Sequence, residues 1–261
     1  MNKDKNSVSV IILTKNEEAQ IEECLKTCDI FDEIIIIDSF SKDKTCDLAR
    51  KYTTRIYQKE FVDFKSQREF GLSLAACGWV FFLDADERLS DGLKNTIKEF
   101  VSQEEYSFLN IPRRNYLLGN WVRYSGWFPD YTGRLVEKST AYFEQDIIHE
   151  KIASNGKVLT LENNSPAYLI HYTCNDFSKY FRKINHYTTL EAAQEYRTKK
   201  FKTSRRAILS RSFGMFTQTL FAHKGYKDGM AGFIIACFNF IYSLLLMIKI
   251  WELRKIRSKD E

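Results

Sequence analysis

Short apolar runs alternate with amphipathic segments over the first hundred residues. Four runs have the length and composition of strands: Ser7–Leu13, Glu33–Ile37, Thr54–Tyr57 and Trp79–Leu83. The segments Glu18–Cys28, Phe64–Ala76 and Asp91–Val101 are expected to be helices, as is a stretch that runs through Arg50. Strands that alternate with helices at this spacing predict βαβ units, so we expect an α/β fold with a mostly parallel sheet.

Three acidic residues follow the fourth run directly. Asp84 and Asp86 are separated by Ala85 and followed by Glu87, at the carboxyl end of a strand expected to be buried on both faces. Ligands of open α/β sheets bind at that edge, and Mg²⁺ or Mn²⁺ takes oxygen ligands of this kind, shared with phosphate. The alternative is a solvated acidic turn, with Asp91 as the N-cap of the next helix.

Polar residues also follow the first two strands. Thr14, Asn16 and Glu17 come after the first, and Asp38 and Ser39 after the second. We expect Asp38 to contact a ribose or a base. No G-x-G-x-x-G follows the first strand, which disfavours a dinucleotide fold of the usual kind.

Other charged residues near these strand ends have two interpretations. Asp43 or Ser41 either caps the helix that follows or, like Thr45, helps to bind a ligand. Lys65 and Arg68 open a helix that points toward the predicted site, where they either meet a diphosphate or remain surface charges.

After a strand expected at Ser107–Arg113, the segment 116–131 is irregular and rich in aromatic residues, suited either to sugar stacking or to a core. Asp130, near the end of this segment, and the pair His149-Glu150, further along the chain, are candidates for chemistry.

The chain has 261 residues, 44% of them hydrophobic, which suits one domain with a core and an appendage. Six scattered cysteines without a CxxC pair predict reduced, buried thiols, with Cys24 and Cys28 facing a core. The N-terminal apolar run is too short for a signal peptide, so we expect the first part of the chain in the cytoplasm.

The character of the chain changes after residue 175, and we divide it into domains 1–175 and 176–261. The segment Arg197–Arg211 holds seven basic residues and no acid, and Met230–Ile248 is an uncharged run of 19 residues followed by more bases.

Basic residues beside large apolar groups suit a helix on anionic lipid. The alternatives are a solvated helix, a membrane span and a contact between copies in a homo-oligomer. A single span with its basic end in the cytoplasm would place the first domain outside, so we favour peripheral or monotopic attachment to the cytoplasmic face of the inner membrane.

Taken together, the motifs resemble those of family 2 glycosyltransferases with the GT-A fold, and more narrowly those of bacterial lipopolysaccharide-core transferases. The motifs that carry this resemblance are Thr14-Lys15-Asn16-Glu17, Asp38-Ser39, Gln67-Arg68, Leu83-Asp84-Ala85-Asp86-Glu87, Arg134-Leu135 and His149-Glu150. They cover roughly residues 7 to 175. The resemblance implies a Rossmann-like sheet and an inverting transfer from a nucleoside-diphosphate sugar, most often a UDP-sugar. It also implies a nucleotide pocket lined by Thr14, Asn16, Glu17 and Asp38, with Asp84 near the ribose and Asp86 on the metal.

The catalytic base departs from the common family pattern, because His149-Glu150 stands where many members carry a Glu-Asp pair. We assign Glu150 as the base, with Asp130 as the second candidate, and His149 as a ligand of the metal or diphosphate. The expected acceptor is lipid-linked or a lipopolysaccharide glycan. A membrane-bound scaffold with an inactive transferase domain and a metal-dependent phosphatase are the alternatives, and no nucleic-acid partner is expected. The phosphatase is disfavoured because phosphatases with a D-x-D motif carry it after the first strand, whereas Asp84-Ala85-Asp86 follows a later strand here.

Overall fold

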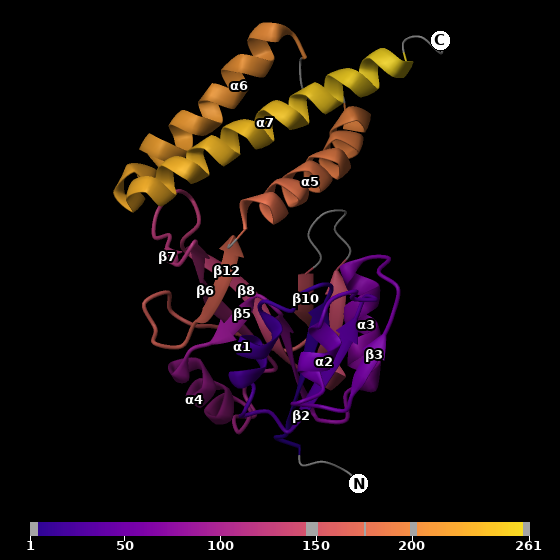
Figure 1. Cartoon of the computed structure of the whole chain (residues 1–261). Coiled ribbons are helices and arrows are strands. Elements are labelled where there is room, and N and C mark those ends of the chain that lie inside the picture. Colours follow the sequence, from indigo (N-terminus) through magenta and orange to yellow (C-terminus); the bar gives the residue numbers. More distant parts are fainter. Residues whose placement is uncertain (1–4, 145–150, 175, 199–202, 258–261) are drawn as a thin grey trace. The chain divides into compact units, whose positions relative to one another are not determined.

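The computed structural model describes residues 5–144, 151–174, 176–198 and 203–257 of the chain (Figure 1). It divides into two compact units, one of residues 1–114 and 129–171, the other of residues 115–128 and 172–261. The structural division therefore adds the segment 115–128 to the C-terminal unit. The functional boundary at residue 175 stays a prediction.

The first unit is built on a mixed sheet with the strand order β3-β2-β1-β4-β8-β6-β12-β5. The principal strands are β1 (Val8–Thr14), β2 (Glu33–Asp38), β3 (Ile56–Gln58), β4 (Trp79–Asp84), β5 (Glu87–Leu89), β6 (Phe108–Leu117), β8 (Asp130–Glu137) and β12 (Leu169–Cys174). Strands β1 to β4 are parallel, as predicted, whereas β8 runs antiparallel to both β4 and β6. The smaller strands are β7 (Asn120–Trp121), β9 (Ala141–Glu144), β10 (Lys151–Ser154) and β11 (Val158–Thr160).

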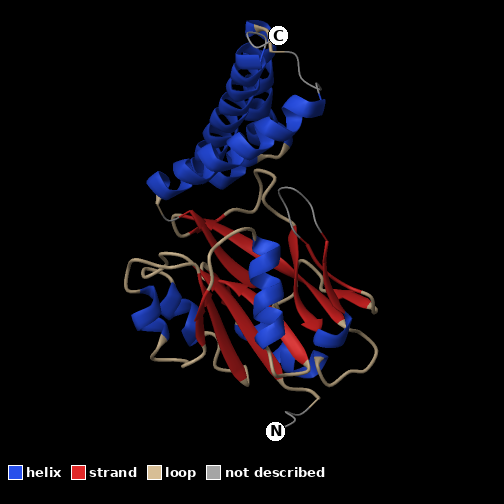
Figure 2. Ribbon diagram, turned by 90° about the vertical axis from the view of Figure 1, so that its right-hand side faces the viewer, coloured by secondary structure: helices blue, strands red, loops and turns tan. Residues whose placement is uncertain are grey.

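Helices cover both faces of this sheet (Figure 2), so the predicted α/β class is confirmed. These helices are α1 (Ile21–Lys26), α2 (Thr45–Ala49), α3 (Phe64–Leu74) and α4 (Asp91–Phe100). Residues 79, 81 and 83 of β4 belong to a core cluster with α1 and α4, and residues 80 and 82 to a cluster on the opposite face, beside α3. Because successive side chains of a strand point to opposite faces, β4 is buried on both sides, as predicted.

Several local predictions need correction. Ser90, not Asp91, is the N-cap of α4, since its Oγ accepts the N–H of Leu93 at 3.2 Å. Helix α3 ends at Leu74, two residues earlier than expected, where the backbone turns extended. The aromatic segment is more regular than predicted, because β7 forms a hairpin with β6 and β8 begins at Asp130.

All six cysteines are free thiols. Cys24 and Cys28 are buried in the core, as predicted, and Cys77 and Cys174 are buried as well, whereas Cys46 and Cys237 are only partly buried, contrary to the prediction.

The second unit is mainly helical. Its helices are α5 (Phe177–Thr198), α6 (Arg205–Thr217) and α7 (Gly229–Arg257), with a π-helical turn at Gln218–Ala222 and a 3₁₀ turn at Gly225–Asp228. Helix α7 packs against both α5 and α6. Gly232 allows the close approach of α7 to the preceding turn, since a Cβ there would lie 1.8 Å from the carbonyl oxygen of Gly225.

One segment of this unit, Gly225–Ile256, is long and apolar enough to cross a membrane by length and composition. It is the only such helix among the described residues, and 44% of its apolar window is buried inside the protein.

Candidate functional site

The carboxyl ends of three neighbouring strands bring the predicted site residues to one edge of the sheet. In the register, Thr14 of β1 lies beside Asp38 of β2, and Leu13 lies beside Asp84 of β4. Adjacent strands are about 4.8 Å apart, so the backbones at Asp38 and Asp84 are separated by roughly 10 Å. Loops from β1, β2 and β4 therefore meet at this edge.

Asp38 organises the loop that follows β2. Its carboxylate is fully buried and accepts hydrogen bonds from Thr14 Oγ1 at 3.0 Å, Ser41 Oγ at 2.5 Å and the Ser41 N–H at 2.9 Å. Ser39 is also buried, and its N–H donates to the Thr14 carbonyl at 2.9 Å. These contacts hold the first two loops together, whereas the predicted contact of Asp38 with a nucleotide stays a prediction.

Asn16 and Glu17 continue the connection between these loops. Asn16 adopts a φ of 57°, a left-handed conformation that asparagine tolerates better than most residues. Its N–H donates to Ser41 Oγ and its Oδ1 accepts the Lys42 N–H, both at 2.8 Å. The N–H of Glu17 donates to Thr45 Oγ1 at 2.8 Å. Residues 14–17 therefore form a rigid rim beside the acidic edge.

Asp43 and Thr45 serve this loop through local bonds. Asp43 Oδ1 accepts the Thr45 N–H at 3.0 Å, and Asp43 Oδ2 accepts the Glu18 N–H at 3.1 Å. Hydrogen bonds to its charged form explain why the pKa of Asp43 lies below its ordinary value although burial raises it. Asp43 thus bonds the first N–H of α2, but the N-cap position is Lys44, which makes no side-chain cap bond, so neither Asp43 nor Ser41 is the N-cap residue.

Asp84 belongs to an ion-pair network with two arginines. Arg134 Nη2 contacts Asp84 Oδ2 at 2.5 Å, and Arg68 Nη2 lies 3.7 Å from Asp84 Oδ1. Burial raises the pKa of the Asp84 carboxyl, but the positive charges of Arg134 and Arg68 outweigh burial and hold that pKa well below its usual range. Asp84 is therefore an anion at neutral pH.

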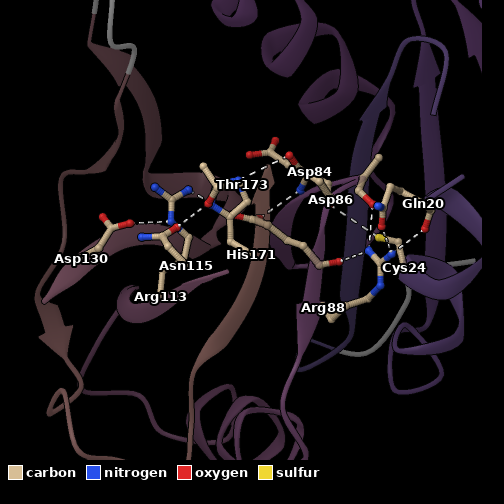
Figure 3. A network of polar contacts seen from close by, with 12 residues as sticks. Gln20, Cys24, Asp84, Asp86, Arg88, Arg113, Asn115, Asp130, His171 and Thr173 are labelled. Carbon is tan, nitrogen blue, oxygen red and sulfur yellow. Dashed lines mark hydrogen bonds and ion pairs between the residues drawn. The ribbon is translucent and has the colours of Figure 1, made fainter. Parts of the chain in front are cut away.

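The network continues inward through Glu87, which is completely buried. Glu87 Oε1 contacts Arg134 Nη2 at 2.7 Å and Arg113 Nη1 at 3.2 Å, while Oε2 accepts the Asp84 N–H at 3.1 Å. Arg113 Nε also contacts Asp130 Oδ2 at 2.8 Å (Figure 3). Asp130 is thereby linked to the acidic turn through Arg113 and Glu87. Burial lowers the pKa of the Arg113 guanidinium, but the negative charges of Glu87 and Asp130 outweigh burial and hold that pKa above its ordinary value. The guanidinium therefore stays charged.

Arg88 fastens the acidic turn to the start of α1. Its side chain is buried, with Nη1 donating to the carbonyls of Ala85 and Glu87 at 2.8 and 2.7 Å. Its Nη2 donates to both the carbonyl and the side-chain oxygen of Gln20, at 2.7 and 2.8 Å. Arg88 thereby bonds both to the turn that carries Asp84 and Asp86 and to Gln20, the residue before α1.

His171 lies beside Asp86, with His171 Nε2 3.4 Å from Asp86 Oδ2 (Figure 3). The antiparallel pairing of β12 with β5 causes this proximity, because His171 pairs with Glu87, the residue after Asp86. An imidazole nitrogen and a carboxylate oxygen are both ligands of divalent transition metals.

These two side chains fit a divalent cation that completes its coordination elsewhere. Within the described part of the chain, no group of three or more His, Cys, Asp or Glu side chains could hold a metal by itself. A cation bound by one or two protein ligands and by substrate phosphates needs no such group.

The structure thus gathers Thr14, Asn16, Glu17, Asp38, Ser39, Arg68, Asp84, Asp86 and Asp130 in the first unit. His149 and Glu150 lie outside the described residues. Sequence reasoning missed His171, one of only four histidines in the chain, which follows an apolar pair just as His149 does. Arg134 and Glu87 belong to the motifs of the sequence, but the sequence assigned them no role.

The family described as Glycosyl transferase family 2 matches residues 9–185. The lipopolysaccharide core biosynthesis glycosyltransferase LpsC of Rhizobium meliloti is 26% identical over 98% of this chain and 96% of its own length. An uncharacterized glycosyltransferase of Rickettsia typhi is 27% identical over 97% of this chain and 88% of its own length.

Among solved structures, the mannosyltransferase PcManGT from Pyrobaculum calidifontis, in complex with GDP-Man and Mn²⁺, matches with a TM-score of 0.53. It is 13% identical, and the match covers 94% of this chain and 86% of that one. At this identity the likeness concerns the fold alone. The chain belongs to glycosyl transferase family 2 and is a glycosyltransferase, and the resemblance inferred from its motifs is confirmed.

Proposed function

We propose that the protein transfers a sugar, with inversion, from a nucleoside-diphosphate sugar to a lipid-linked or lipopolysaccharide acceptor of the cell envelope. The arrangement of Asp84, Asp86 and His171 at the strand edge, beside the rim of residues 14–17, supports this proposal most directly. A UDP-sugar is the proposed donor, because the motifs resemble family members that use UDP-sugars most often. The relative LpsC, with its role in lipopolysaccharide core biosynthesis, supports the class of acceptor.

Asp86 and His171 are the proposed ligands of Mg²⁺ or Mn²⁺, and His149 is a further candidate. A divalent cation bound there would neutralise charge on the diphosphate leaving group. Thr14, Asn16, Glu17, Asp38 and Ser39 are the proposed nucleotide-binding residues. Arg68, whose Nη2 lies 3.7 Å from Asp84 Oδ1, is the proposed partner of the diphosphate.

Inversion by direct displacement requires a base on the side of the sugar opposite the leaving diphosphate. Glu150 is the proposed base, and its carboxylate would accept the proton of the attacking acceptor hydroxyl. Asp130 is the second candidate, and its Oδ2 contacts Arg113.

The Glu150→Gln variant is expected to lose turnover by roughly a hundredfold to ten-thousandfold, the usual worth of general base catalysis. The Asp130→Asn variant is the comparison, and we expect it to lose less. Transfer kinetics with saturating donor would measure both. If Glu150→Gln keeps near-normal turnover while Asp130→Asn loses it, the assignment of the base is wrong.

The proposed function itself is tested by thermal unfolding of the whole protein with UDP-, GDP- and dTDP-sugars, each with Mn²⁺, with Mg²⁺ or with chelator. A donor at a hundred times its Kd stabilises the folded state by about 2.7 kcal/mol, or roughly 5–10 °C in Tm for a chain of this size. Slow release of the nucleoside diphosphate without acceptor would separate an active enzyme from an inactive scaffold. A protein that no donor stabilises with either metal would contradict the proposal.

We also propose that the protein acts at the cytoplasmic face of the inner membrane, attached peripherally or monotopically. Nucleotide sugars are cytoplasmic, and a lipid-linked acceptor would have to be reached at the membrane surface. The apolar character of α7 supports attachment through the second unit, and a contact between copies of the chain is the alternative.

A further inference from the structure

Helix α7 has two faces of different character. One is buried against α5 and α6 and includes Ile235, Leu246 and Ile250. The opposite face is apolar and turned outward, with 72% of Met230, 48% of Phe233 and 46% of Trp251 exposed. The residues of this outward face recur three or four apart: Met230, Phe233, Cys237, Phe240, Leu244, Ile248 and Trp251.

Helix α6 extends this outward face. Leu209 and Phe213 are 51% and 57% exposed, and they lie four residues apart on the helix. The ring of Phe213 lies 5.1 Å from that of Phe240, and the ring of Phe216 lies 6.1 Å from that of Phe233. The rings of the two helices therefore join into one surface, here called the apolar face: Leu209, Phe213, Phe216 and the outward residues of α7.

Three polar side chains in the middle and second half of α7, those of Asn239, Tyr242 and Lys249, form hydrogen bonds with neighbouring segments. Asn239 Nδ2 donates to Thr219 Oγ1 at 2.8 Å, and the Tyr242 hydroxyl donates to Glu191 Oε2 at 2.5 Å. Lys249 Nζ donates to both the carbonyl and the side-chain oxygen of Asn185 in α5, at 2.6 and 2.8 Å. A surface helix in water carries polar residues on its outward face, whereas the outward face of α7 is apolar. The apolar face is therefore built for an apolar environment.

The distribution of charged residues around the apolar face indicates what lies beside this apolar environment. Residues 203–257 contain nine Lys and Arg but only two acids, Asp228 and Glu252. The carboxylate of Asp228 is engaged within the unit, accepting the Arg123 N–H at 3.0 Å and the Ser125 hydroxyl at 2.8 Å. Basic residues border the uncharged middle at both ends. They are Arg205 and Arg206 at the start of α6, Lys224 and Lys227 in the turns, and Arg254 and Lys255 near the end of α7. An apolar strip between basic ends complements anionic lipid headgroups over hydrocarbon.

The neighbours of α7 argue against a span. From Met230 to Trp251 the helix is about 33 Å long, enough to cross a bilayer. However, α5 and α6 pack along it and carry exposed charges at Lys179, Arg182 and Arg211. A perpendicular α7 would draw these charges into the hydrocarbon, at a cost of several kcal/mol each. An orientation in the plane of the membrane leaves them in water.

We propose that the apolar face of α6 and α7 lies in the plane of an anionic membrane surface, embedded in one leaflet, with the flanking bases on the headgroups. This docking surface is additional to sugar transfer and does not depend on the donor, the metal or the catalytic base.

Sedimentation of the full chain with phosphatidylglycerol–phosphatidylcholine vesicles tests the apolar part. The double variant Phe233→Gln and Ile248→Gln is expected to lower the partition coefficient at least tenfold, because two large apolar side chains no longer gain from leaving water. The control Val62→Gln alters a side chain of the first unit that is 74% exposed, and we expect no change. Both variants should keep the wild-type circular dichroism, since the altered side chains face outward.

Charge reversal tests the electrostatic part. Arg205→Glu with Arg206→Glu is expected to weaken binding to the mixed vesicles by roughly fivefold or more for each charge altered, and not to pure phosphatidylcholine. The control Lys51→Glu with Lys98→Glu makes the same change in net charge in the first unit. Carbonate at alkaline pH should release the protein from native membranes.

Other outcomes would overturn the proposal. One is vesicle binding that neither double variant weakens. A second is the absence of vesicle binding by the wild-type protein. Another is a lipid-free dimer that the Phe233 and Ile248 changes convert to monomer while vesicle binding persists, since a second copy would then cover the face. Full retention in the carbonate pellet would indicate a span. Donor-induced thermal shifts, measured in parallel, report on the first unit, so failure of the proposed function would be recognised separately.

Discussion

Replacing Asp86 by alanine is expected to lower metal-dependent turnover by on the order of a thousandfold while the fold is retained. A bound cation contributes several kcal/mol to the stabilisation of developing negative charge, and each 1.36 kcal/mol is a factor of about ten in rate. The Asp86 side chain is 33% exposed and lies in a turn that Arg88 holds independently. Its removal should therefore change the free energy of unfolding by no more than about 0.5 kcal/mol.

The measurement is donor hydrolysis and transfer at graded Mn²⁺ and Mg²⁺, with circular dichroism to monitor the fold. Asp91→Ala is the matched control, because Asp91 is an exposed acid five residues away, and we expect it to keep its turnover. His171→Gln should raise the metal concentration needed for half-maximal rate while much of kcat returns at saturating metal. Wild-type activity that is undiminished in chelator would refute the role assigned to both residues.

Replacing Arg134 by methionine is expected to destabilise the protein by about 3–5 kcal/mol. Arg134 is 3% exposed, and its Nη2 contacts both Asp84 and the completely buried Glu87. Removal of one partner from a buried ion pair leaves the other charge inadequately compensated, which is the costly case. Urea unfolding of the purified protein would measure the loss.

Two further variants serve as controls for the predicted effect of Arg134→Met on stability. Arg50→Met removes an exposed arginine paired with Asp47 and should cost no more than about 1 kcal/mol. Arg134→Met combined with Glu87→Leu removes the buried charge of Glu87 together with its partner, and it should be less destabilised than the sum of the single changes. Strict additivity of the two would mean that the pair is not coupled.

The same network predicts a dependence on pH. Because the folded-state pKa of Asp84 lies below its ordinary value of 3.8, its contribution to stability is present above that value and is lost as the pH falls toward the folded-state pKa. The stability difference between wild type and Arg134→Met should therefore shrink as the pH drops below about 4. A difference that grows on acidification would contradict the charged state assigned to Asp84.

Much of the catalytic unit could be predicted from local pattern. The β-branched run at Val8–Thr14 and the aromatic run at Trp79–Asp84 are strands because their side chains suit a sheet covered on both faces. The placement of Asp84 and Asp86 at the binding edge followed from the parallel arrangement, since every parallel strand ends at the same side.

The role of Asp38 shows where local pattern is insufficient. Its position after β2 predicts ligand contact, which stays a prediction, but it does not predict that the carboxylate is buried and bonded to Thr14 and Ser41. Whether a carboxylate at a strand end faces a ligand or its own loop depends on the conformation of that loop. The left-handed backbone of Asn16 and its bond to Ser41 contribute to this conformation, and neither has a signature in hydrophobic periodicity.

The sequence by itself determined the class of fold, the alternation of strands and helices over the first hundred residues, and the acids that end β2 and β4. These features arise from side-chain periodicity within a few residues, which needs no knowledge of distant partners. Only the tertiary structure decided that His171 lies beside Asp86, that Arg134 and Arg113 enclose Glu87, and that three polar side chains of α7 bond to neighbouring segments. These contacts join segments tens of residues apart through antiparallel pairing and helix packing, and such registers are set by the fit of whole surfaces rather than by any local run of residues.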